Sequence, residues 1–156
     1  EGIELGSGNS YFTIDFWMKF NSVSGAQPFC QYQDDDNRIV LGYSQTTGWN
    51  FIILSGGTPL VNSVQGSATM SDTNWHHIAL VRNSNTWSIY QDGTSVASVS
   101  DGDAYPSLYG VLLIGCEKYG VNYLNFLNGW IDEFRISKGV ARWTANFTPP
   151  QNEYYF

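Results

Sequence analysis

The chain has few cysteines, few basic residues and no long apolar run, and each shortage excludes a class of protein. Its two cysteines, Cys30 and Cys116, lie far apart and have no cysteine or histidine nearby at the spacing of a zinc site. The 7 basic residues form no cluster and are outnumbered by 14 acidic ones, which argues against a nucleic-acid-binding surface. No apolar run approaches the roughly 20 residues of a membrane span, so we expect no membrane insertion.

Glycine, asparagine, serine, threonine and aromatic residues are plentiful instead, and the net charge is −7. A polar but sparsely ionised surface is typical of extracellular or particle-borne β-proteins and suits neutral, hydroxyl-rich ligands. At 156 residues the chain is expected to form one domain over residues 1–156 and to bury roughly 70% of its unfolded surface. Two alternatives are open for the cysteines, one disulfide between strands or two free thiols. A core of this size needs no cross-link.

Alternation of apolar and polar residues predicts strands along nearly the whole chain. In 11–20, Phe12, Ile14, Phe16, Met18 and Phe20 share one face. Further strands are expected at 27–32, 38–44, 48–55, 60–65, 75–82, 87–91, 94–99 and 112–115, and Asp92-Gly93 predicts a hairpin turn. No stretch has sustained helical periodicity, although 137–144 is expected to form one short helical turn. The prediction is an all-β, two-sheet antiparallel sandwich of the jelly-roll type.

The segment 128–150 carries the most informative pattern. It begins as a strand in which Trp130, Asp132, Phe134 and Ile136 alternate onto one face, while Ile131, Glu133 and Arg135 share the other. Because an unpaired buried charge is costly, Asp132 on an apolar face needs hydrogen-bond donors or a cation. Glu133 and Arg135 are expected to pair near solvent at little energetic gain.

Several segments in this order resemble the laminin-G-like, concanavalin-A-like jelly-roll domains. They are Phe12-Thr-Ile-Asp-Phe-Trp-Met, Trp75-His-His-Ile-Ala-Leu-Val-Arg, Ile89-Tyr-Gln-Asp-Gly, Leu113-Ile-Gly and Asn128-Gly-Trp-Ile-Asp-Glu-Phe-Arg-Ile-Ser-Lys-Gly-Val-Ala-Arg-Trp. The resemblance covers essentially the whole chain and is strongest to domains of bacteriophage tail and structural proteins. It implies a non-catalytic binding domain, most often for glycans and often with calcium.

One departure from the family concerns the start of the chain. Members usually begin with an earlier strand ending in Phe-Asp-Gly-Ser-Gly, whereas only residues 1–10 precede the strand at 11–20 here. Either that strand is lost or cut away, or another segment takes its place. The replacement would be Asn152-Glu-Tyr-Tyr-Phe156 or a neighbouring subunit.

Sugar binding requires exposed aromatic faces and polar groups that read hydroxyls, and loops on a rigid sandwich collect both. The best match is a predicted loop containing two tyrosines and two asparagines. The candidate ligand-binding residues are Tyr119, Asn122, Tyr123, Asn125, Tyr32 and Trp49. Most other aromatic residues are expected in the core, among them Trp17, Trp75, Trp87, Trp130 and Phe134.

Asp132 is the best candidate for a structural calcium ligand, with backbone carbonyls of Gly6 and Asn9 as partners. The alternative is that backbone amides alone satisfy this carboxylate. Asp34-Asp-Asp-Asn37 lacks the full EF-hand pattern and is expected to be an acidic hairpin tip. Neighbouring strand residues point to opposite faces, so His76 and His77 are not expected to share a metal.

These features predict a lectin-like module on a virion or extracellular surface that binds a polysaccharide or glycan, with no catalytic residues. The alternative is a structural domain that binds neighbouring virion proteins or self-associates. A glycoside hydrolase is a distant third, because it needs two carboxylates flanking the scissile bond, and no strand here has the acids at i, i+2 and i+4 of the related endoglucanases.

Overall fold

The computed structural model describes residues 11–23, 25–66, 68–102 and 107–151. These residues form twelve strands and no helix. The strands are β1 (Phe12–Phe20), β2 (Ala26–Asp34), β3 (Asn37–Ser44), β4 (Gly48–Ser55), β5 (Thr58–Gly66), β6 (His76–Asn83), β7 (Thr86–Gln91), β8 (Thr94–Ser100), β9 (Val111–Ile114), β10 (Glu117–Tyr119), β11 (Asn122–Leu124) and β12 (Gly129–Lys138).

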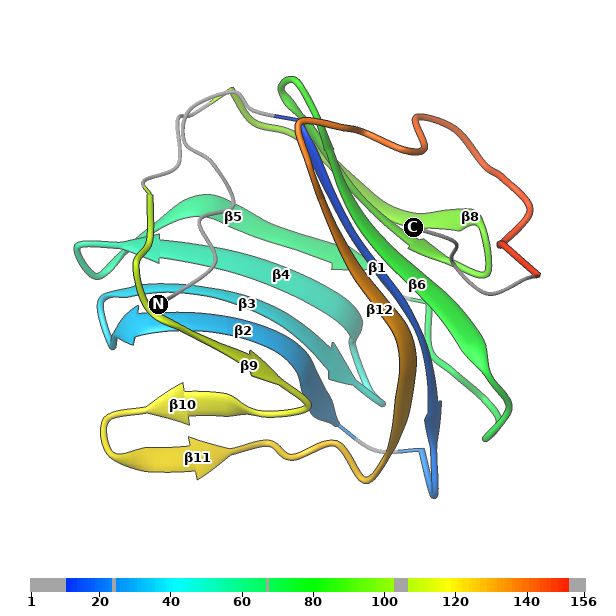
Figure 1. Ribbon diagram of the computed structural model, residues 1–156, viewed down its shortest axis with the longest axis horizontal. Helices are drawn as coiled ribbons and strands as arrows, with labels where there is room; N and C mark the ends of the chain where they lie inside the picture. The colour runs from blue at the N-terminus through cyan, green and yellow to red at the C-terminus, as the bar shows by residue number, and fades with distance from the viewer. Residues whose placement is uncertain (1–10, 24, 67, 103–106, 152–156) are drawn as a thin grey trace.

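Two five-stranded antiparallel sheets face each other and form the predicted sandwich (Figure 1). Sheet A has the strand order β12-β1-β6-β7-β8, and sheet B has the order β5-β4-β3-β2-β9. The edges meet where β5 approaches β8, since a Cβ on Gly66 would lie 2.6 Å from the Val96 carbonyl oxygen. The two-stranded hairpin β10–β11 is a separate third unit beside β2 and β9.

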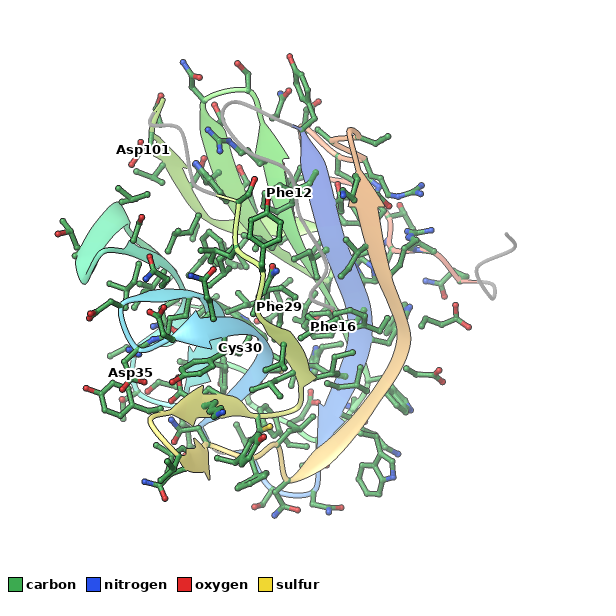
Figure 2. The ribbon with its side chains drawn as sticks, turned by 60° about the vertical axis from the view of Figure 1, so that its left-hand side comes forward. Phe12, Phe16, Phe29, Cys30, Asp35 and Asp101 are labelled. Atoms are coloured by element: carbon green, nitrogen blue, oxygen red, sulfur yellow. The ribbon has the colours of Figure 1, made fainter. Side chains whose placement is uncertain are left out.

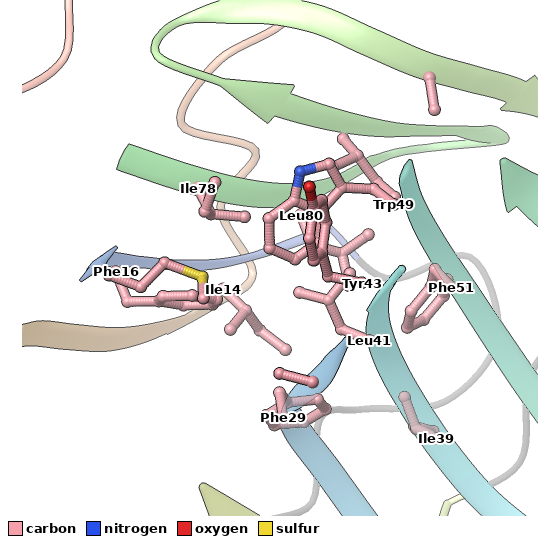
Figure 3. Packing of buried hydrophobic residues seen from close by; sticks show 14 of the residues in the cluster. Ile14, Phe16, Phe29, Ile39, Leu41, Tyr43, Trp49, Phe51, Ile78 and Leu80 are labelled. Carbon is pink, nitrogen blue, oxygen red and sulfur yellow. The ribbon is translucent and has the colours of Figure 1, made fainter. Parts of the chain in front are cut away.

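The core lies between the sheets and follows the predicted alternation. The five alternate apolar residues of β1, from Phe12 to Phe20, are all at most 1% exposed. Aromatic rings of sheet B meet them from the other side, including Phe29, Phe51 and Trp49 (Figure 3). Phe134 joins this core by stacking on Phe16, with ring centroids 5.6 Å apart. Loss of one such ring would cost about 3–5 kcal/mol of stability.

A β-bulge in β12 changes the side to which its first residues point. Asp15 pairs with Arg135 but Trp17 pairs with Asp132, so β12 has one more residue than β1 over this stretch. Glu133 takes a positive φ of 51° at this point. As a result Ile131, Phe134 and Ile136 pack on the core, while Trp130 and Asp132 are exposed on the outer face. The prediction that Asp132 shares a face with Phe134 was therefore wrong, because simple alternation does not reveal a bulge.

The residues after β12 form an irregular strap over the outer face of sheet A. The predicted helical turn at 137–144 is absent from these described residues, because backbone groups of the strap bond to β1 instead. The Thr13 hydroxyl donates to the Val140 carbonyl at 2.9 Å and accepts from the Arg142 amide at 3.0 Å. Trp143 and Phe147 stack on each other, 4.0 Å between centroids, and cover Ala79, Val81 and Tyr90.

The strap encloses a cluster of charged side chains that alternation alone would place in solvent. Asp15 and His77 are fully buried, and Arg135 binds the Asp15 carboxylate through Nε at 3.0 Å and Nη2 at 2.8 Å. His77 Nε2 lies 3.4 Å from Asp15 Oδ2, and its ring contacts Trp143. Arg135 therefore pairs with the buried Asp15, a partner that alternation did not predict. The two histidines face apart as predicted, since His76 is partly exposed and contacts Asp72 and Asp92.

Candidate functional site

The predicted loop at 119–125 is a β-hairpin held against the outer face of sheet B. After β9 the chain reverses at Gly115, which has a φ of 82° and donates its amide to the Pro28 carbonyl at 3.0 Å. The Leu127 amide then donates to the Gly115 carbonyl at 2.8 Å, which closes the base of the hairpin. The prediction of a loop was wrong because each of these strands has only three residues, too few to show alternation.

Asp35 fastens the hairpin tip to the β2–β3 turn. Its Oδ1 accepts the Gly120 amide at 2.6 Å and the Tyr32 hydroxyl at 2.8 Å (Figure 2). The Gly120 amide, followed by the Tyr32 hydroxyl, lowers the pKa of the Asp35 carboxyl. The hydrogen bond that the Tyr32 hydroxyl donates to Asp35, followed by burial, raises the pKa of Tyr32. The acidic hairpin tip predicted at 34–37 is thus present, and one of its carboxylates positions the hairpin.

The structure brings three of the predicted tyrosines together with two cations. We name Tyr32, Arg38, Lys118, Tyr119, Asn122 and Tyr123 the hairpin surface. Arg38 lies over the Tyr119 ring at 5.0 Å, and Lys118 Nζ lies 5.0 Å from the Tyr32 centroid and 5.8 Å from that of Tyr123. Such cation–π contacts hold exposed rings in place with about 0.5–1 kcal/mol each.

Strand register divides the hairpin surface into two sides. Tyr119 pairs with Asn122, and Lys118 pairs with Tyr123, so the two tyrosines lie on opposite sides of the ribbon. Tyr119 is 54% exposed and Tyr123 50%, whereas Tyr32 is buried and supports Lys118 from below. Asn125 is also exposed, with a φ of 50°, and its amide donates to Glu117 Oε1. Each side of the hairpin thus carries one half-exposed tyrosine ring.

Trp49 is not part of this surface, so the prediction that it contacts ligand was wrong. Its side chain is fully buried between the sheets, and its Nε1–H donates to Gln91 Oε1 at 2.9 Å (Figure 3). Strand alternation places Trp49 with Phe51 and Ile53 on the core face of β4.

The hairpin also lies over Cys30 on β2, and Cys116 immediately precedes β10. Both are free, so the bridged alternative does not hold. Cys30 is buried on the outer face of sheet B (Figure 2), where burial raises its pKa to about 11. A thiol with so high a pKa is a poor nucleophile at neutral pH.

The described residues provide few ligands for a calcium ion at Asp132. Its carboxylate is exposed, and Oδ1 already accepts the Glu133 amide at 2.8 Å. Calcium takes six to eight oxygen ligands, and the described part of the chain contains no group of three or more His, Cys, Asp or Glu side chains that could hold a metal. Gly6 and Asn9 lie outside the described residues, as do 152–156. Calcium binding therefore stays a prediction.

Sequence reasoning missed one exposed aromatic cluster on sheet A. Trp75 and Trp130, both expected in the core, are 40% and 47% exposed and lie on either side of Lys19. Trp130 precedes the bulge, and Trp75 stands immediately before β6, after the polar stretch Ser71-Asp-Thr-Asn74. That flanking position was the only available signal that Trp75 lies at a surface.

The anchor at Asp35 yields a testable result. Replacing Asp35 with asparagine should speed hydrogen exchange of the Gly120 amide and of β10–β11 at pH 7, because a neutral acceptor replaces a charge-assisted one. Since the folded pKa is depressed, the contribution is present above the unfolded pKa and is lost as the pH falls through the folded pKa. Amide exchange by NMR measures both effects.

Asp36→Asn is the matched control, because Asp36 belongs to the same turn and is exposed. Exchange in the hairpin should be unchanged in that variant. Equal exchange in wild type and Asp35→Asn would show that Asp35 does not anchor the hairpin.

Comparisons with known proteins identify the fold family. Residues 3–144 match the model of the laminin G family described as the concanavalin A-like lectin/glucanases superfamily. No curated protein sequence is similar enough to count as a relative. The described residues contain no helix long and apolar enough to cross a membrane.

Solved structures of other sandwiches superimpose on most of the chain. The carbohydrate-binding module CBM40 of the Ruminococcus gnavus IT-sialidase, also solved with α2,3 sialyllactose, has a TM-score of 0.65 at 15% identity and covers 88% of this chain and 89% of its own. Domain 4 of AbnA, a Geobacillus stearothermophilus extracellular arabinanase in complex with arabinotriose, has a TM-score of 0.61 at 19% identity, with 86% of this chain and 63% of the other covered.

Domains LG4-5 of the mouse laminin α1 chain have a TM-score of 0.63 at 13% identity, and the match covers 88% of this chain and 36% of that one. At these identities the likeness concerns the fold alone. The family match over most of the sequence agrees with the two-sheet architecture, and the chain therefore belongs to the concanavalin A-like lectin/glucanase superfamily of laminin-G-like domains.

Proposed function

We propose that the chain is a non-catalytic carbohydrate-binding module that attaches to a host or surface glycan through the hairpin surface. The observation that carries the proposal is the pair of half-exposed tyrosines, held by Arg38 and Lys118 on a hairpin that Asp35 fixes to the sheet. Rigid exposed rings lose little conformational entropy when a sugar stacks on them. Structures of similar fold are modules solved with sugars, which supports the same ligand class here.

The proposed mechanism is weak capture strengthened by many copies. Stacking on Tyr119 or Tyr123 would orient a pyranose, and Asn122 would exchange hydrogen bonds with its hydroxyls. One shallow contact of this kind binds weakly, but display on a phage virion or another extracellular surface multiplies the affinity by about 10²–10⁴. We include the virion or extracellular location in the proposal for this reason.

Replacing both Tyr119 and Tyr123 with alanine should abolish glycan binding, with at least a tenfold loss, about 1.4 kcal/mol, for each ring. A glycan array of host and environmental polysaccharides, followed by calorimetry on the best ligand, measures this. Tyr11→Ala is the control, since Tyr11 is 45% exposed, immediately precedes β1 and is not part of the hairpin surface. Full binding by the double variant would remove the hairpin surface from the proposal.

Calcium is a separate part of the proposal. If an ion supports the site, chelator should weaken glycan binding and lower the melting temperature, and Asp132→Asn should remove the calcium dependence. If chelator changes neither binding nor melting, calcium has no part in this domain.

A second candidate function is assembly with neighbouring virion subunits or with a second copy of the chain. Exposed apolar side chains occur just before and on β9, on the hairpin and on its connection to β12, namely Tyr109, Val111, Ile114, Val121, Leu124 and Phe126. Large exposed apolar patches often mark protein interfaces. Stable multimers in analytical ultracentrifugation, together with no binding to any glycan on the array, would favour assembly over sugar binding.

A further inference from the structure

Two exposed tryptophans hold a lysine between them on the outer face of sheet A. Lys19, near the end of β1, has Trp130 as its cross-strand partner on β12. Its Nζ lies 4.5 Å from the Trp130 ring centroid and 5.0 Å from that of Trp75. The two indole centroids are thus no farther apart than the sum of these distances, and one short oligosaccharide can contact both. We name Lys19, Trp75 and Trp130 the tryptophan clamp.

The clamp lies apart from the hairpin surface in the fold. It is formed by β1, β12 and the residue before β6, all of sheet A, whereas the hairpin packs on sheet B (Figure 1). It is also outside the strap, which covers Ala79, Val81 and Tyr90 farther along the same sheet. Both tryptophans therefore remain accessible in the folded chain.

Among the described residues, the neighbours of the Lys19 ammonium are aromatic. Within the described residues, no carboxylate oxygen lies within 4.0 Å of its Nζ, although the chain has 14 acidic residues against 7 basic ones. Contact with ring faces stabilises an ammonium without neutralising its charge. Its N–H groups therefore favour an anionic oxygen, to which hydrogen bonds are roughly twice as strong as neutral ones.

We propose that the tryptophan clamp binds a carboxylate-bearing pyranose of an acidic polysaccharide. The sugar ring would lie against an exposed indole, and its carboxylate would accept a hydrogen bond from Lys19 Nζ. The low charge density of the whole surface favours neutral ligands, and a net charge of −7 repels polyanions at long range. Binding of an acidic chain must therefore depend on this local cation.

Asp132 provides a test of whether the bound sugar is negatively charged. It is exposed on the same face, since it pairs with Trp17 where Trp130 pairs with Lys19, and its Oδ1 accepts the Glu133 amide. A negative charge at this position opposes an acidic ligand. Asp132→Asn should therefore strengthen binding of an acidic sugar by about two- to fivefold, a modest effect expected of a screened surface charge.

The experiment compares the folded chain and its variants on polygalacturonate, alginate and hyaluronate by affinity electrophoresis and calorimetry. Chelator is present so that calcium cannot cross-link the polysaccharides. Methyl-esterified polygalacturonate is the matched ligand, because it keeps the same sugar backbone without free carboxylates. Lys19→Met removes the charge and keeps the side-chain length, and Lys19→Arg restores the charge.

We expect at least one of the three acidic polymers to bind, and binding to fall about tenfold or more on Lys19→Met or Trp130→Ala. Lys19→Arg should retain it, and raising the salt concentration should weaken it. Where polygalacturonate binds, its ester should bind at least about tenfold more weakly. The Tyr119→Ala/Tyr123→Ala variant should bind as the wild type does.

The proposal would be overturned by no binding to any of the three acidic polymers, by unchanged binding of Lys19→Met, or by equal binding of the ester and the acid. These outcomes do not affect the hairpin surface, which is tested by the tyrosine variants on the glycan array. Conversely, if the tyrosine variants keep full glycan binding, the effect of the Lys19 variants on acidic polymers can still be interpreted. A near-UV circular dichroism spectrum equal to that of the wild type confirms that each variant is folded.

Discussion

Replacing Asp15 with alanine should lower the free energy of unfolding by about 3–5 kcal/mol, because it leaves charge uncompensated in the protein interior. Asp15 is fully buried, and both its carboxylate oxygens bind Arg135, which is only 16% exposed in its side chain. His77 lies against the same carboxylate. Urea unfolding should show a lower midpoint with an unchanged slope.

Asp36→Ala is the control, since Asp36 is an exposed carboxylate and its loss should change stability by no more than about 0.5 kcal/mol. The double variant Asp15→Leu/Arg135→Met removes both charges and should be more stable than Asp15→Ala. A loss below about 1 kcal/mol for Asp15→Ala would show that the cluster is solvated and that the strap does not seal it.

Replacing Gly93 with alanine should detach the strap as well as strain the β7–β8 turn. Gly93 has a φ of 76°, and a Cβ there would lie 1.8 Å from the Phe147 carbonyl oxygen. The positive φ alone costs roughly 1–3 kcal/mol for a residue with a side chain. The clash is with backbone, which cannot rotate away, so the Phe147 amide must also lose its 2.9 Å bond to the Gly93 carbonyl.

Gly56→Ala separates the two effects, because Gly56 occupies the β4–β5 turn with a φ of 56° and its Cβ would meet no atom within 4 Å. Both variants should lower the unfolding midpoint, but only Gly93→Ala should expose Trp143 and Phe147. Hydrogen exchange in 140–148 reports the strap directly. If the two variants have equal exchange in that segment, the strap is not held by this turn.

Much of the fold could be predicted because core strands leave a two-residue pattern. The alternation in β1 and the Asp92-Gly93 turn both arise from local sterics and from burial of one face. The family resemblance is confirmed by the match over residues 3–144. Errors arose where local pattern and tertiary packing diverge, as at Asp132, where one extra residue in β12 turns the earlier side chains outward.

The candidate site divides in the same way. Tyr119 and Tyr123 were expected at a surface from their polar surroundings, and both are exposed. Their support by Arg38 and Asp35 could not be predicted, because those residues are more than 80 positions away in the chain. Trp49 was expected at the surface and is buried, whereas Trp130 was expected in the core and is exposed. Burial of an aromatic ring depends on which elements cover its face.

By itself, the amino-acid sequence determined that this protein is an all-β sandwich, because strand periodicity and turn chemistry depend on neighbours a few residues apart. Only the tertiary structure decided that Asp15 is buried, that Cys30 is covered and that Trp75 and Trp130 enclose Lys19 at the surface. Each of these environments is created by segments distant in the chain, and the free energy that places a side chain there comes from those long-range contacts.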